Sequence, residues 1–253
     1  MPRLLAPALL ALAVLGAPVS APAQSFTDTQ RGDIETIVKS YLIAHPEVLE
    51  EAMNELQKRQ TAAESAKHEA SIAQNAEAIF NSPRGVTLGN KNGDVTFVEF
   101  FDYNCGYCKR AMADMLDLLK NDGKLKVVLK EFPVLSEGSV EAARVAVAVR
   151  MQDPTGKKYL DFHQKLLGGR GVADKARALA AAKDAGLDTA RIEKDMTSPE
   201  VKATIQENMK LAEEMGLNGT PSYVIGRQIV VGAVGLDQLK EKIGIARCGK
   251  ASC

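Results

Sequence analysis

The sequence contains no tryptophan, and aromatic residues make up only 5% of its 253 residues. This scarcity disfavours proteins that bind single-stranded nucleic acid by stacking bases on aromatic side chains. Neither sign of charge is in excess, because 32 basic residues balance 32 acidic ones. Since a general nucleic-acid binder needs a basic face, we expect no nucleic-acid partner. The 45% of apolar and 25% of charged residues are typical of an ordinary soluble protein with one or two domains, and disfavour a disordered or polytopic membrane protein.

Cysteine is also rare, and the four cysteines are too few to build a disulfide scaffold. They form two pairs: Cys105-Gly106-Tyr107-Cys108 near the middle of the chain, and Cys248 with Cys253 at its end. Paired cysteines of this kind indicate redox chemistry or a metal. No histidine–cysteine spacing matches a zinc finger. The glycine-rich run at 168–171 lies between helices, whereas a phosphate-binding loop follows a strand. We therefore expect no metal and no cofactor.

A long apolar run is missing everywhere except at the N-terminus. Arg3 supplies a positive charge, Leu4–Gly16 is apolar, and Ala21-Pro22-Ala23 places small residues where a signal peptidase cleaves. The pattern predicts a cleaved signal peptide over 1–23 and export to a compartment where disulfides persist. The alternative is an uncleaved anchor, but the apolar run is short for a hydrocarbon core of ~30 Å.

Residues 24–81 contain no pattern typical of a strand, and we call this predicted helical segment the stalk. One amphipathic helix carries Ile34, Ile37 and Tyr41, and it is interrupted at His45-Pro46 because proline excludes its predecessor from a helix interior. A second helix follows with a heptad period that is mostly alanine. Because such a seam buries little in one chain, the stalk is predicted to oligomerise. The alternatives are a helix packed on its own domain and a flexible linker.

The rest of the chain alternates between strand and helix patterns. A buried strand over 95–101 precedes a helix over 107–119 and a second strand over 125–132. Four helices are expected within 137–215, at 140–151, 157–167, 173–185 and 199–215. Strands at 222–225 and 228–231 form a hairpin, and a helix over 236–243 follows. The pattern predicts an α/β fold with an inserted helical domain, and it leaves the last cysteine pair in a tail.

Cys105 lies between a buried strand and the next helix, where the helix N-terminus favours thiolate over thiol. Cys108 lies one helical turn later, within reach of a disulfide. We expect Cys105 to be the exposed, attacking sulfur and Cys108 the shielded, resolving one. The alternative is half of a zinc site.

Two further features accompany the pair. Glu99 shares the strand face of Phe97 and Phe101, so it is expected to be buried below the cysteines with a raised pKa and to exchange protons with Cys108. The alternative is a glutamate at the strand edge that faces water. Thr220-Pro221, just before a strand, is the position expected for a cis peptide bond beside the cysteines.

These motifs together resemble the DsbA family of bacterial periplasmic thiol–disulfide oxidoreductases, which have a thioredoxin-like fold with a helical insert. The resemblance rests on runs at 99–103, 105–108, 130–133 and 219–221, with weaker similarity at 139–148 and 162–163. The stalk, with Tyr41-Leu42-Ile43-Ala44-His45-Pro46-Glu47-Val48-Leu49, is similar to the suppressor-of-copper-sensitivity branch, ScsC. This comparison divides the chain into a signal peptide (1–23), the stalk (24–81), a DsbA-like domain (82–246, insert 137–215) and a tail (247–253).

The resemblance implies that Cys105 is the nucleophile, Cys108 its partner, and Thr220, Pro221 and Tyr107 the contacts to substrate. It also implies a periplasmic location, protein substrates with thiols or disulfides, and a membrane redox partner that resets the pair. Some members of the ScsC branch are trimers and disulfide isomerases, so we expect a homotrimer, with a dimer as second choice. Gly106-Tyr107 replaces the Pro-His of strongly oxidising members, which favours an isomerase or reductase. The alternative is a copper- or zinc-binding stress protein, since soft thiolates favour Cu(I).

Cys248 and Cys253 have no counterpart in the family pattern. We expect a structural disulfide that closes a small terminal loop. The alternatives are a labile redox pair and a pair of metal ligands.

Overall fold

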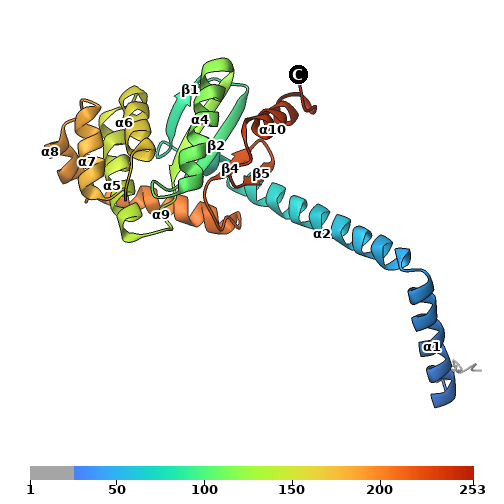
Figure 1. Ribbon diagram of the computed structural model, residues 1–253. Helices are drawn as coiled ribbons and strands as arrows, with labels where there is room; N and C mark the ends of the chain where they lie inside the picture. The colour runs from blue at the N-terminus through green and yellow to red at the C-terminus, as the bar shows by residue number, and fades with distance from the viewer. Residues whose placement is uncertain (1–25) are drawn as a thin grey trace, which may run out of the picture. The chain divides into compact units, whose positions relative to one another are not determined.

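The computed structural model describes residues 26–253, and the predicted signal peptide lies outside them. The chain divides into two compact units between Lys58 and Arg59, which are described separately here. The helices of the N-terminal unit are α1 (Asp28–Ala44) and the first part of α2 (Glu47–Gln74) (Figure 1). α1 begins with a capping box between Thr27 and Gln30, and the chain leaves the helix at His45, as the proline at 46 predicts.

The apolar side chains of the N-terminal unit are exposed. α1 buries none of its residues, although its sequence carries an apolar stripe. Ile37 is 67% exposed, Ile43 70% and Met53 70%. Other large apolar side chains are also exposed here: Phe26, Ile34, Val38, Tyr41, Leu49 and Leu56. Within the described residues, the unit therefore presents apolar surface that its own helices leave uncovered.

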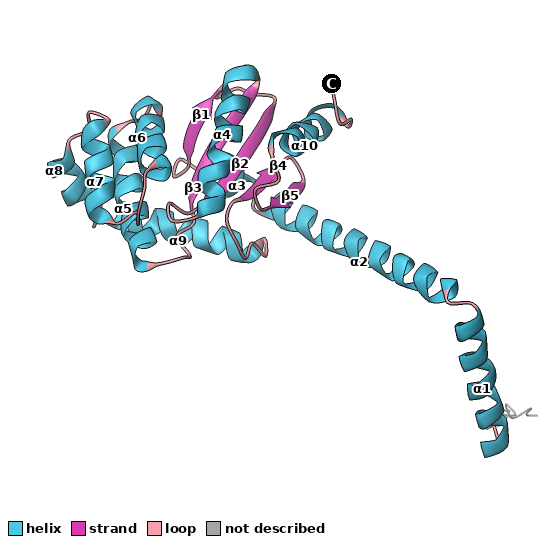
Figure 2. Ribbon diagram, in the orientation of Figure 1, coloured by secondary structure: helices cyan, strands magenta, loops and turns pink. Residues whose placement is uncertain are grey.

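The second unit is built on a five-stranded sheet in the order β1-β3-β2-β4-β5 (Figure 2). β2 (Val95–Phe101) pairs in parallel with β3 (Leu125–Glu131), and the other pairs are antiparallel. The edge strands are β1 (Val86–Gly89) and β5 (Gln228–Val231), and β4 (Ser222–Ile225) lies between β2 and β5. The hairpin between β4 and β5 turns at Gly226-Arg227, as predicted.

The two faces of β2 enter different hydrophobic cores, because successive side chains of a strand point to opposite sides. Phe97 and Phe101 join the core formed with α4 (Gly106–Asn121), α10 (Leu236–Cys248) and the helical insert. Val98 and Phe100 join the core on the other face, which includes Leu211 of α9 (Pro199–Glu214). Since Glu99 has the parity of Phe97 and Phe101, its carboxyl group faces α4.

The helical insert lies beside the sheet (Figure 1). It consists of α5 (Glu137–Gln152), α6 (Lys157–Gly168), α7 (Lys175–Asp184), α8 (Thr189–Asp195) and α9. The alanine- and valine-rich α5 is its centre, and 142–149 are buried except at Arg144. This arrangement confirms the thioredoxin-like α/β fold with an inserted helical domain.

The structure differs from the sequence prediction in where the stalk ends and the domain begins. Ile72 of α2 is 3% exposed, and Ile79 of α3 (Ala76–Phe80) is fully buried in the core shared with Val98 and Phe100. Residues from Arg59 onward thus belong to the second unit, and a stalk that extends to residue 81 is wrong. The heptad pattern missed this because a partly alanine seam looks the same whether it faces another chain or its own domain.

Three further elements were missed or misplaced. The short β1, which glycine and asparagine residues surround, and the seven-residue α8 have no counterpart among the expected strands and helices. α10 continues through Arg247 to Cys248, so these residues are helical and do not lie in a tail. Among the described residues, no helix has the length and apolar character needed to cross a membrane.

Candidate functional site: a buried dithiol at the start of a helix

Asp102 shapes the loop that carries Cys105. Its carboxylate accepts hydrogen bonds from the backbone amides of Asn104 (2.8 Å), Val134 (2.9 Å) and Leu135 (3.0 Å). The Cys105 amide donates to the Asp102 carbonyl oxygen at 3.0 Å. These bonds join the end of β2 to the segment after β3, and so fix the position of the first cysteine.

Asn104 connects the same loop to the helical insert. Its side-chain amide donates to the Ala173 carbonyl oxygen (2.9 Å), and its Oδ1 accepts from the Ala173 amide (2.7 Å). Such a reciprocal pair satisfies both backbone groups of one residue. The insert therefore restrains the residue that directly precedes Cys105.

Cys105 is the N-cap of α4, and its sulfur accepts a hydrogen bond from the Cys108 amide at 3.3 Å. The Cys105 thiol donates to the Thr220 carbonyl oxygen at 3.2 Å. Both cysteines are free. The expectation that Cys105 is exposed is wrong: Cys105 is 6% exposed and Cys108 0%, so both thiols are buried and only their order is as predicted. The loop that ends at Thr220 covers the first sulfur.

The Thr220–Pro221 peptide bond is cis, as expected at this place in the topology. The Pro221 carbonyl oxygen accepts a hydrogen bond from the Gly232 amide at 2.8 Å, which ties the loop to the end of β5. Tyr107, between the cysteines, is 59% exposed, and the Arg110 guanidinium lies 4.3 Å from its ring centroid. The cysteine loop thus presents an aromatic side chain to solvent.

Glu99 lies below the dithiol and is 2% exposed. Burial, together with the negative charge of Asp114 on α4, raises its pKa to about 8. Burial also raises the pKa of Cys108, and the charge of Glu99 contributes in the same direction. The alternative of a water-facing glutamate is therefore wrong.

Sequence reasoning missed a buried polar network beside the site. The Tyr159 hydroxyl donates to Glu131 and lies 3.3 Å from the Tyr103 hydroxyl, which is 3.3 Å from His163 Nδ1. Burial raises the pKa of Glu131 to about 8 and lowers the pKa of His163 to about 3. Both side chains are thus neutral near pH 7. His163 is packed in the insert, and only the topology could show that it lies next to Tyr103 and that Tyr159 bonds to Glu131.

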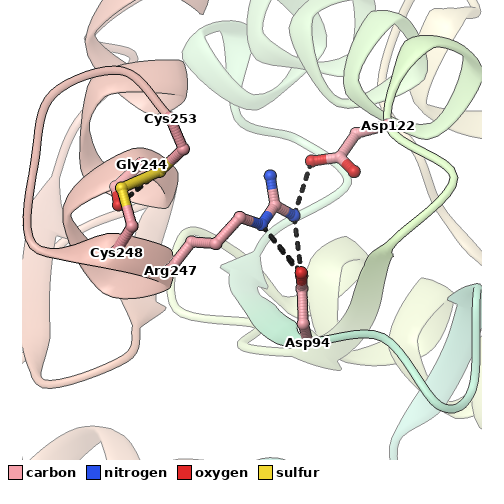
Figure 3. Close-up of a disulfide and its surroundings, with 6 residues drawn as sticks. All are labelled: Asp94, Asp122, Gly244, Arg247, Cys248 and Cys253. Carbon is pink, nitrogen blue, oxygen red and sulfur yellow. Dashed lines mark hydrogen bonds and ion pairs between the residues drawn. A yellow bond between two sulfur atoms is a disulfide. The ribbon is translucent and has the colours of Figure 1, made fainter.

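The C-terminal cysteines form a disulfide (Figure 3). Cys253 Sγ lies 3.3 Å from the Gly244 carbonyl oxygen, and a Cβ at Gly244 would come within 2.6 Å of the Ala251 carbonyl oxygen. Beside it, Arg247 donates to Asp94 (2.8 Å) and Asp122 (2.9 Å), which precede β2 and follow α4. Since Cys105 lies at the other ends of β2 and α4, the two cysteine pairs occupy opposite poles of the domain.

Within residues 26–253, no three or more histidine, cysteine or acidic side chains are grouped so as to hold a metal ion.

Residues 96–244 match the model of the DSBA-like thioredoxin domain, and residues 30–63 match that of the copper resistance protein ScsC N-terminal domain. The chain belongs to the DsbA family. It is a thiol–disulfide oxidoreductase of that family, with Cys105 and Cys108 as its cysteine pair. Its N-terminal segment places it with ScsC proteins.

Solved structures agree with this assignment. A thioredoxin-like oxidoreductase from Silicibacter pomeroyi is 46% identical, with 68% of this chain and 96% of that one covered (TM-score 0.64). A linker-deletion mutant of Proteus mirabilis ScsC is 29% identical, with 89% and 98% covered (TM-score 0.66). The thiol-disulfide exchange protein alpha-DsbA2 from Wolbachia pipientis is 32% identical, with 72% and 96% covered (TM-score 0.66).

Two NhaA sodium/proton antiporters among the curated relatives are much longer than this chain. The NhaA sodium/proton antiporter of Herminiimonas arsenicoxydans is 27% identical over 143 residues, and the chain spans only 22% of its length. The similarity involves 56% of this chain.

Proposed function

We propose that this DsbA-family protein is a periplasmic disulfide isomerase and reductase that acts as a homotrimer on misfolded or oxidised exported proteins. The observation that carries the proposal is the uncovered apolar surface of α1 and the start of α2, in the segment that matches the ScsC N-terminal domain. A single-site oxidase has no need of such a segment. An isomerase gains from it, because several active sites can hold one misfolded chain through repeated exchange.

The reaction begins with the Cys105 thiolate. It attacks one sulfur of a substrate disulfide, so that a Cys105–substrate bond forms and the second substrate sulfur leaves as a thiolate. If a different substrate thiolate attacks the substrate sulfur of the mixed disulfide, a new substrate disulfide forms, the Cys105–substrate bond breaks, and Cys105 leaves as a thiolate, so the substrate is isomerised. If Cys108 attacks, a Cys105–Cys108 disulfide forms, and the substrate leaves reduced by two electrons. A membrane dithiol partner then returns the pair to its reduced form.

Glu99 acts in the reductive route, in which Cys108 attacks the mixed disulfide. Cys108 must lose its proton before it attacks, and its buried position opposes the thiolate. Glu99 is buried on the same face, and with a pKa of about 8 it can accept and release a proton near neutral pH. Glu99 is therefore assigned as the base for Cys108.

Substrate polypeptide is held beside Thr220, Pro221 and the exposed Tyr107. An apolar groove lies between the segment after β3 and α9, and its lining includes Phe132, Val134, Ile205, Met209 and Leu217. The Val134 amide donates a hydrogen bond to Asp102, whose carboxylate also accepts from the loop before Cys105, so one residue links the groove lining to that loop. A groove of this character fits the apolar segments that misfolded proteins expose.

The activity is tested by the refolding of a scrambled multi-disulfide protein. The mature chain should restore its activity, Cys105→Ala should not, and Cys108→Ala should keep isomerisation but lose net reduction. Isomerisation by Cys105→Ala at the rate of the unsubstituted protein would refute the assignment.

Copper binding is the second candidate, supported by the match to a copper resistance domain. The paired thiols Cys105 and Cys108 are suitable soft ligands for Cu(I). Titration of the reduced protein with Cu(I) separates the functions: a sequestering protein binds stoichiometrically and tightly, whereas an oxidoreductase exchanges disulfides whether or not copper is present.

A further inference from the structure

Tyr223 lies directly opposite Glu99 on the adjacent antiparallel strand. Its side chain is 1% exposed, and its ring centroid lies 5.1 Å from that of Phe97. Within the part of the chain that the structure describes, its buried hydroxyl group has no hydrogen-bond partner. A buried hydroxyl without a partner is costly, so its position calls for an explanation.

The groups around Tyr223 are those of the dithiol site. Glu99 on β2 has the strongest electrostatic effect on it, followed by Cys108 and Asp114 of α4 and by Cys105. β5 places the apolar Val230 opposite, and α10 supplies Asp237, which acts on Asp114. Burial raises the pKa of Tyr223, so the phenol stays protonated and can donate a hydrogen bond to an anion.

Negative charge forms in this pocket during one step of the proposed reaction. When Cys108 resolves the mixed disulfide, its proton passes to the Glu99 carboxylate. A Cys105–Cys108 bond forms, the Cys105–substrate bond breaks, and the substrate sulfur leaves with the electron pair. Before and during this step, the charge is located on Glu99 or Cys108, both buried. A neutral donor beside them stabilises that charge without adding a competing one.

We propose that Tyr223 is a positioning residue for the resolving step, in which its hydroxyl group donates a hydrogen bond to the charge that forms on Glu99 and Cys108. This role rests on the proposed function, because it requires Cys108 to act as the resolving thiol. The unpaired hydroxyl is then explained as a donor held ready for an anion that is absent when both groups are protonated.

Tyr223→Phe tests the role, because it removes the hydroxyl group and keeps the ring that packs on Phe97. A hydrogen bond to a charged group predicts that resolution slows about 10- to 100-fold. Loss of the donor also raises the pKa of the groups that carry the charge, so the pH at half-maximal rate should rise by about one unit. Lost packing alone would lower stability without moving the pH profile.

The probe is oxidised glutathione, and quenched mass spectrometry follows both steps. In the Cys108→Ala background, the mixed disulfide at Cys105 should form at the same rate with and without the Tyr223→Phe substitution. With Cys108 present, release of the second glutathione should be slow in Tyr223→Phe alone. Phe97→Leu is the matched control, which disturbs the same packing and should leave the pH profile unchanged.

The outcomes separate the two proposals. If Cys108→Ala forms no mixed disulfide at Cys105, the proposed function fails. If the mixed disulfide forms and Tyr223→Phe leaves both the resolution rate and its pH profile unchanged, the role of Tyr223 is refuted. Should Tyr223→Phe not fold, Tyr223→Met supplies an apolar side chain without a donor for the same comparison.

Discussion

The Cys105 thiol donates a hydrogen bond at 3.2 Å to the backbone carbonyl oxygen of Thr220, 115 residues later in the chain. The bond joins the start of α4 to the loop before β4, two segments that only the tertiary fold brings together. A substrate sulfur that approaches Cys105 must therefore meet the Thr220–Pro221 loop. This relationship explains why the nucleophile can be buried in the free protein and still lie next to a proposed substrate-binding loop.

Alkylation should distinguish the two thiols. Cys108 is fully buried and burial raises its pKa, whereas Cys105 is 6% exposed and is the N-cap of α4. Iodoacetamide should therefore modify Cys105 at least ten-fold faster, because only the thiolate reacts and access is required. Mass spectrometry of the peptides gives both rates. Equal rates from pH 4 to 9 would contradict the assignment of Cys105 as the attacking sulfur.

Stability should fall as the pH rises from about 6.5 to 8. Glu99 and Glu131 have folded-state pKa values of about 8, above the ordinary value of 4.5. The stability that their protonated forms contribute is therefore complete below pH 4.5 and is lost as the pH rises to 8. Burial lowers the pKa of His163 from 6.5 to about 3, so its contribution to stability increases with pH up to pH 6.5. It therefore offsets the loss from the two glutamates only below that pH. Urea unfolding should show a loss of up to roughly 4 kcal/mol over that window.

Glu131→Gln provides the control for this pH dependence. Glutamine retains an acceptor for the Tyr159 hydroxyl but does not ionise. The decrease between pH 6.5 and 8 should shrink by about half, since Glu99 still titrates. A protein whose stability is constant or increases over this window would show that neither carboxyl group is held neutral by burial.

The C-terminal disulfide should contribute stability and no activity. It closes a loop with a sequence separation of only 5, for which the loss of chain entropy predicts roughly 2 kcal/mol. Cys248→Ser with Cys253→Ser should lower the free energy of unfolding by up to that amount and leave glutathione exchange at Cys105 unchanged. Loss of exchange in this double variant would link the distal pair to the reaction.

Ile37→Asp should dissociate the proposed trimer. Ile37 is 67% exposed in the chain by itself, so the change costs the monomer little but places a charge in an apolar interface. Sedimentation at micromolar concentration should give a single-chain mass. Glu51→Gln changes another exposed residue of the N-terminal unit and should leave the assembly intact. If both variants sediment like the unsubstituted protein, α1 does not form the interface.

Local patterns were sufficient for the elements that position the dithiol. The strand at 95–101 and the hairpin at 222–231 have the predicted bounds, because β-branched and aromatic residues alternate there between clear turn signals. The same alternation placed Glu99 correctly on the face of Phe97. Resemblance of the motifs then supplied the fold and the family.

Other features depend on contacts distant in sequence. The burial of Cys105 arises from the Thr220 loop, and the Tyr103–Tyr159–Glu131 network from the insert that packs beside β3. Ile72 and Ile79 look like stalk residues in the sequence, and only the second core shows that they belong to the domain. No local period encodes which of two partners an apolar face will meet.

The isomerase rate per active site, measured for residues 24–253 and for residues 59–253, tests the account most directly. The shorter chain keeps the compact second unit with Ile72 and Ile79, so its dithiol should still react with glutathione. The longer chain should reactivate a scrambled multi-disulfide protein, whereas the shorter one should lose this activity and retain dithiol exchange. Equal isomerase rates for the two chains would contradict the claim that assembly through the N-terminal helices makes this oxidoreductase an isomerase.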